Sequence, residues 1–120
     1  MPGYVAEEEI PALISAARVL LLPSWYEGFG LPILQAQACG TPVITSDRAS
    51  MPEVGGEGAL YARPDEPEEI SRAMRTLMDD PDVWERCRAL GLENVKRYSW
   101  DATAQGTRLV YERALGMVRA

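Results

Sequence analysis

The chain has no histidine among its 120 residues and only two cysteines, Cys39 and Cys87. These cysteines are far apart and lack the closely spaced Cys or His partners that a zinc site requires. We therefore expect no metal site and no disulfide, and we interpret both residues as free thiols of a cytosolic protein.

Basic residues are also scarce, since 12 Lys and Arg stand against 18 Asp and Glu, which gives a net charge of −6. General nucleic-acid binding needs clustered Lys and Arg, so we expect no nucleic-acid partner. An anionic ligand is still allowed, because the backbone N–H groups at a helix start bind phosphate locally.

Long hydrophobic runs are missing as well. A membrane span needs ~20 apolar residues, and the run Leu20-Leu21-Leu22 is far shorter. The first four residues have neither the basic end nor the apolar stretch of a signal peptide. We therefore expect no transmembrane segment and a cytoplasmic location.

What is present has the composition of one ordinary globular domain, with 47% hydrophobic and 25% charged residues. Strands are expected at 18–23, 41–45 and 59–62, and helices at 7–17, 31–39, 65–78, 81–97 and 100–115. Strands separated by helices imply parallel βαβ units, although three strands make a thin sheet. We predict a single partial α/β domain, with a Rossmann-like βαβ part at 1–63 and C-terminal helices at 64–120.

Burial can also be predicted from these patterns. The continuous apolar run at 18–23 is typical of a strand buried on both faces. The apolar stripes of the last three helices are expected to face the core. Gly40 is expected to end the helix at 31–39 in the left-handed conformation.

The most informative stretch runs from Glu27 through Gly28, Phe29 and Gly30 to Leu31, at the start of an apolar helix. The glycines allow a ligand to approach the backbone, and the N–H groups of the last three residues are expected donors to a diphosphate. The Glu27 carboxylate repels phosphate but accepts hydrogen bonds from hydroxyls of a sugar or ribose. A tight strand-to-helix turn without a ligand is the alternative interpretation.

A family resemblance covers nearly the whole chain, from Gly3 to about Ala114. The matching text is Gly3-Tyr4-Val5, Pro23 to Pro32, Ala38 to Ile44, Pro52-Glu53-Val54 and Tyr98-Ser99-Trp100. In this order and spacing, these pieces resemble the C-terminal half of the donor domain of family 4 retaining glycosyltransferases, which have the GT-B fold.

The resemblance implies a function for the loop. Enzymes of this kind move a sugar from a nucleotide diphosphate sugar to a sugar or lipid-linked acceptor, without a metal or other cofactor. Glu27 matches the first glutamate of the family motif, so it would contact the transferred sugar near the reacting carbon as the catalytic residue. Gly28, Phe29, Gly30 and Leu31 would bind the donor's diphosphate through their backbone.

Gln35 departs from the family pattern, which has a second glutamate there for the ribose hydroxyls. An amide still accepts a hydrogen bond but carries no charge, so we expect donor binding to be weaker by about 1 kcal/mol. The resemblance also implies an acceptor-binding N-terminal domain, and an upstream Arg and Lys that neutralise the diphosphate. We therefore expect the isolated chain to lack useful transferase activity, and the parent enzyme to be cytoplasmic or peripheral at the membrane.

Several other residues have two interpretations. Trp25 and Tyr26 either pack beside the loop, which we favour, or line the sugar pocket. Glu53 is expected to cap a one-turn helix, and Arg48 to be a solvated loop charge rather than a phosphate ligand. For the chain as a whole, the alternative to an enzyme fragment is a non-catalytic module that self-associates through an exposed strand edge or uncovered helix faces.

Overall fold

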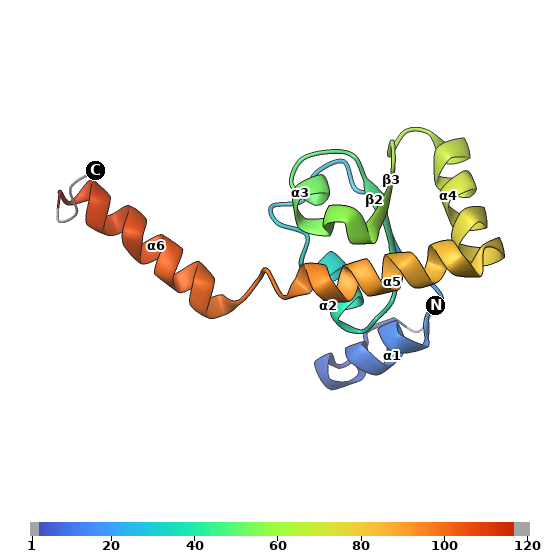
Figure 1. Ribbon diagram of the computed structural model, residues 1–120, viewed down its shortest axis with the longest axis horizontal. Coiled ribbons are helices and arrows are strands. Elements are labelled where there is room, and N and C mark those ends of the chain that lie inside the picture. The colour runs from blue at the N-terminus through green and yellow to red at the C-terminus, as the bar shows by residue number, and fades with distance from the viewer. Residues whose placement is uncertain (1–2, 117–120) are drawn as a thin grey trace.

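The computed structural model describes residues 3–116 (Figure 1). In chain order, its elements are η1 (Glu7–Glu9), α1 (Ile10–Ala16), β1 (Leu20–Leu22), α2 (Leu31–Ala38), β2 (Val43–Ser46), α3 (Met51–Gly55), η2 (Gly56–Gly58), β3 (Ala59–Ala62), α4 (Pro67–Asp79), α5 (Pro81–Val95) and α6 (Trp100–Ala114), where η marks a 3-10 helix. The three expected strands are present, and they form one parallel sheet in the order β1-β2-β3. The expected α/β fold class is confirmed.

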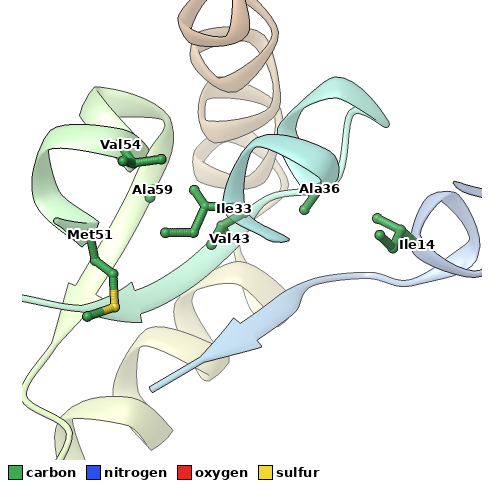
Figure 2. Close-up of a cluster of buried hydrophobic side chains, with 7 residues drawn as sticks. All are labelled: Ile14, Ile33, Ala36, Val43, Met51, Val54 and Ala59. Carbon is green, nitrogen blue, oxygen red and sulfur yellow. The ribbon is translucent and has the colours of Figure 1, made fainter. Parts of the chain in front are cut away.

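The main hydrophobic core lies where α1, α2 and α3 meet strands β2 and β3 (Figure 2). Its buried side chains are Ile14, Ile33, Ala36, Val43, Met51, Val54 and Ala59. A second cluster, of Ile44, Leu77 and Cys87, joins β2 to α4 and α5. The successive residues Val43 and Ile44 belong to different clusters, as expected for a strand that is covered on both faces.

Strand β1 differs from its expected burial. Leu20 and Leu22 pack against the main core, but Leu21 between them is 39% exposed. The strand pairs only with β2, so it is an edge of the described sheet. The prediction that this strand is buried on both faces is therefore wrong.

Helix α5 lies across the amino-terminal ends of the three strands. Its contacts place Trp84 beside Arg18 before β1, Arg88 beside Gly40 before β2, and Gly91 beside Gly58 before β3. These three α5 residues have the spacing of one helix face, and they follow the order of the strands in the sheet. The carboxyl ends of the strands, where ligands of parallel sheets bind, are on the opposite side from α5.

A buried polar seam fixes α5 against the rest of the molecule. The amide nitrogen Nδ2 of Asn94 donates to Gln37 Oε1 and to the carbonyl of Val54, both at 2.8 Å. Gln37 Nε2 in turn donates to the carbonyl of Gly55 at 2.8 Å. These bonds satisfy polar groups that are removed from water, and they join α2, α3 and α5.

Helix α6 projects away from the other elements (Figure 1). Its side chains Trp100, Val110 and Tyr111 are 78%, 63% and 66% exposed. The radius of gyration is 16.7 Å, whereas a compact chain of this length would have about 14 Å. The expectation that the apolar stripe of this helix faces a core is therefore wrong, and the uncovered helix face expected as the alternative describes α6, which has no buried residue. The equivalent stripes of α4 and α5 do contribute Leu77 and Cys87 to the core.

Candidate functional site

The Glu27 loop leaves the carboxyl end of β1 and leads into α2. Ser24 Oγ donates a hydrogen bond to Glu27 Oε1 at 2.9 Å. Within residues 3–116, no hydrogen bond reaches the second carboxylate oxygen. The carboxylate is thus held in one orientation with an acceptor oxygen left for a ligand hydroxyl.

The two glycines of this loop have different roles. Gly30 precedes α2 in the left-handed conformation, with φ 97° and ψ 43°, which disfavours any side chain. A β-carbon at Gly28 would have nothing within 4 Å. The protein interior therefore does not require glycine at position 28, and the open space beside it can admit a ligand to the backbone.

Ser50 connects the loop after β2 to the Glu27 loop. Its hydroxyl lies 3.0 Å from the carbonyl oxygen of Glu27 and 2.9 Å from that of Phe29. The Phe29 ring also makes an edge contact with Tyr98, with ring centroids 5.8 Å apart. Sequence reasoning missed Ser50, because its local pattern Ser-x-x-Glu with Glu53 predicts a helix cap and not a contact with a distant loop.

Gln35 lies on an exposed stripe of α2, together with Leu31 and Ala38. Their spacing puts the three side chains on one helix face, and four residues of helix span about 6 Å. A hollow of about 400 Å³ opens beside this stripe, between α2 and the η1–α1 segment. Gln35 and Glu7 are its polar side chains, and the rest of its lining is apolar. The structure thus places Gly28 to Leu31 at one end of α2 and Gln35 further along the same helix.

A second hollow, of about 370 Å³, lies between the Glu27 loop with the start of α2 and the start of α6. Phe29, Leu31, Tyr98 and Trp100 contribute to its apolar lining. Its polar groups belong to Tyr98, Ser99, Trp100 and Thr103, and the three hydroxyls among them already make hydrogen bonds within the protein. Gln35, the residue expected to contact the ribose, thus lies at the first hollow, and its role stays a prediction.

The other residues singled out from the sequence lie at the surface. Trp25 and Tyr26 are 63% and 77% exposed, so the prediction that they pack beside the loop is wrong. Arg48 forms a 3.1 Å ion pair with Asp47, in the exposed loop that follows β2. Glu53 is in the first turn of α3, but within residues 3–116 its side chain makes no hydrogen bond, so the expectation that it caps this helix is wrong; its carbonyl accepts a hydrogen bond from Tyr98.

Both cysteines are free, as predicted, and burial raises the pKa of the Cys87 thiol. Within residues 3–116, no three His, Cys, Asp or Glu side chains gather closely enough to hold a metal ion. None of the helices in the same range combines the length and the apolar character needed to cross a membrane.

The parallel sheet, with a glycine-bracketed loop at the carboxyl end of a strand, defines a Rossmann-like α/β domain. Residues 1–97 match the family model described as glycosyl transferases group 1. The chain belongs to this family.

Individual relatives agree with this assignment. The chain is 44% identical over 99 residues to O-antigen chain mannosyltransferase B of Escherichia coli, and the aligned region covers 82% of this chain and 26% of the relative. It is 37% identical over 120 residues to MMP alpha-(1->4)-mannosyltransferase of Mycolicibacterium hassiacum, and the aligned region covers 97% of this chain and 29% of the relative.

A solved structure of sucrose-phosphate synthase from Thermosynechococcus elongatus matches with a TM-score of 0.82 and 29% identity, over 97% of this chain and 30% of the synthase. This similarity confirms the expected fold, that of part of a GT-B enzyme. The chain spans less than a third of the length of each of these three proteins.

Proposed function

We propose that this chain binds the nucleotide diphosphate sugar in a retaining glycosyltransferase that passes the sugar to a sugar or lipid-linked acceptor. The observation that carries the proposal is the Glu27 loop. A carboxylate oriented by Ser24 lies beside a glycine-rich backbone, at the carboxyl end of a parallel strand. This arrangement offers one acceptor for hydroxyls and several N–H donors for phosphate.

Each part of the donor has a proposed contact. The free oxygen of Glu27 accepts hydrogen bonds from the transferred sugar, near the carbon that reacts. The backbone from Gly28 to Leu31 binds the diphosphate, where the start of α2 favours negative charge. Gln35, further along the same helix, binds the ribose hydroxyls at the polar side of the larger hollow.

Transfer itself requires more than this site. The diphosphate leaving group gains negative charge as the sugar departs, and cationic side chains are the usual means of stabilising it when no metal takes part. No Lys or Arg comes from the loop between Pro23 and Gly30 or from α2. We therefore propose that the isolated chain has no useful transferase activity, and that an N-terminal acceptor domain and upstream cations complete the parent enzyme.

Binding can be tested on the chain itself by NMR titration, which detects weak complexes. Two relatives are named mannosyltransferases, so GDP-mannose is the first donor to test, with UDP-glucose and ADP-glucose for comparison. Shifts of the Gly28 and Gly30 amides are expected with at least one of these donors. If none of the three donors perturbs these amides, the proposed function is wrong.

Two variants separate the proposed contacts. Glu27→Gln removes a charged acceptor that faces only the sugar, so it should weaken GDP-mannose binding about fivefold, for a loss of ~1 kcal/mol, and leave GDP binding unchanged. Gln35→Ala should weaken the binding of both GDP and GDP-mannose, because both ligands contain the ribose. Equal effects of Glu27→Gln on GDP and GDP-mannose would contradict the assignment of Glu27 to the sugar.

A second candidate function is a self-associating module without catalysis. The exposed apolar side chains of α6 favour it, because surfaces of this kind commonly contact another protein. In the enzyme interpretation, the same helix packs on the missing domain. Sedimentation velocity of the chain distinguishes the two, since a monomer at all concentrations would remove the support for self-association.

A further inference from the structure

We propose that Ser50 is a positioning residue of the donor loop. Its hydroxyl holds the carbonyl groups of Glu27 and Phe29, so that the N–H groups of Gly28 and Gly30 point together toward the diphosphate. The ligand in this inference rests on the proposed function, whereas the positioning of the loop can be tested without any ligand.

The first argument is the geometry of the contact. Ser50 Oγ lies 3.0 Å from the carbonyl oxygen of Glu27 and 2.9 Å from that of Phe29, across 23 and 21 positions of sequence. One hydroxyl proton is therefore shared between two carbonyls of the same loop. This contact holds the peptide groups that follow Glu27 and Phe29 in place relative to the loop after β2.

The second argument is the local contact that Ser50 does not make. It occupies the N-cap position of α3, where a serine side chain commonly accepts a hydrogen bond from the following turn. In this structure the Ser50 side chain makes no cap hydrogen bond, whereas the N-cap residue Ser99 accepts one from the N–H of Ala102 at 3.0 Å. The Ser50 hydroxyl is used for the loop instead of for its own helix.

The third argument is the direction of the peptide groups. The peptide bonds that follow Glu27 and Phe29 are trans, so the C=O and N–H of each point in opposite directions. Because both carbonyls face Ser50, the N–H groups of Gly28 and Gly30 face away from it, on a common side. Within residues 3–116, neither N–H donates a hydrogen bond to another residue. Two N–H groups without a partner on the side away from Ser50 are the donors that the loop has available for an anion.

The experiment compares Ser50→Ala, which removes the hydroxyl, with Ser50→Thr, which retains it. Ser99→Ala is the matched control, because it removes the hydroxyl of a serine at another helix start. In the free chain, ¹⁵N relaxation should show lower order of the Gly28 and Gly30 amides in Ser50→Ala only. Unchanged order in Ser50→Ala would overturn the inference, and so would lowered order in Ser50→Thr.

The second readout is binding of inorganic pyrophosphate, the simplest probe for a diphosphate site. A net hydrogen bond of this kind corresponds to about a 2- to 12-fold change in affinity. Affinity also falls when a smaller fraction of the molecules has the loop in its binding conformation. Ser50→Ala loses about one such hydrogen bond, so it should bind pyrophosphate about 2- to 12-fold more weakly than wild type. Ser99→Ala should bind pyrophosphate like wild type. Equal affinity of Ser50→Ala and wild type would overturn the positioning role.

Failure of the proposed function gives a different result. If wild type binds neither pyrophosphate nor a nucleotide sugar, the proposed ligand is wrong. The relaxation data on the free chain then still decide whether Ser50 holds the loop.

Discussion

Replacing Gly58 with alanine tests how closely α5 approaches the sheet. A β-carbon at Gly58 would lie 2.5 Å from the Cα and the N of Gly91, and 2.9 Å from the carbonyl carbon of Leu90. All three are backbone atoms of α5, so no side-chain rotation can relieve the contact. Gly58 does not have a positive φ, so the alanine backbone is itself unstrained and the effect is purely steric.

The size of the effect follows from the distances. Moving the contact from 2.5 Å to an ordinary 3.4 Å requires α5 to shift by about 0.9 Å. Overpacking of this kind costs about 1–3 kcal/mol. The same shift stretches the two hydrogen bonds that Asn94 makes at 2.8 Å, each of which contributes about 1 kcal/mol. We expect Gly58→Ala to lower the free energy of unfolding by about 3–5 kcal/mol.

Urea unfolding followed by tryptophan fluorescence measures this loss. Gly91→Ala is the informative comparison, because its β-carbon would meet side-chain atoms of Gln37, the nearest at 3.0 Å, and not the backbone of another element. Alanine in a helix also gains about 1 kcal/mol over glycine, so this variant should lose much less stability. Gly106→Ala, in open space on α6, should leave the transition unchanged. A loss below about 1 kcal/mol for Gly58→Ala would refute the steric argument.

Three further predictions concern single contacts. Tyr61→Phe should destabilise the chain by about 1 kcal/mol at neutral pH, because the hydroxyl donates to a backbone carbonyl at 2.6 Å. Burial, with a smaller effect of a neighbouring tyrosine, raises the pKa of Tyr61 to about 12. An unfolded tyrosine ionises near pH ~10, so wild type should lose stability between these two values in urea titrations, and Tyr61→Phe should lose less over the same range. Gln35→Glu should tighten GDP binding about fivefold in calorimetry by restoring a charged acceptor, and no gain would argue against the ribose contact. Asn94→Asp places a carboxylate against two buried acceptors, so it should lower the free energy of unfolding in urea by about 2–4 kcal/mol. An unchanged free energy of unfolding would mean that the polar seam contributes little to stability.

Local patterns predicted the local parts of this fold. The three strands were found from short apolar runs, and Gly40 does end its helix with a positive φ of 71°. The start of α6 was also found, because Ser99 is a side-chain cap that acts within one turn. Each of these features depends on residues that are close in sequence, where periodicity and turn chemistry are informative.

The errors concern contacts between distant segments. An apolar stripe on α6 indicates that one face can be buried, but it does not say which element covers it. Leu21 was expected to be buried, because an apolar run does not reveal whether its strand has one neighbour or two. Ser50 gave a capping pattern, yet its hydroxyl binds a loop more than 20 positions away. The glycine-bracketed loop at the start of a helix predicted an anion and hydroxyl site, the family resemblance gave its residues their roles, and these roles stay predictions.

The position of α6 has a consequence for how this chain melts. A single helix of 15 residues with little tertiary packing is only marginally stable in water, and it unfolds gradually with temperature. Strand β2 contributes to both buried clusters and α5 to the second, so the strands and α5 should unfold together. All helices contribute to the circular dichroism signal, so the helical signal should decrease before the main transition begins. In a variant that keeps Trp84 but lacks Trp25 and Trp100, the fluorescence transition should occur only when the sheet is lost, because Trp84 is anchored to Arg18 by a 2.8 Å hydrogen bond. One chain would thus give two melting curves, and only the second would report the stability of the domain.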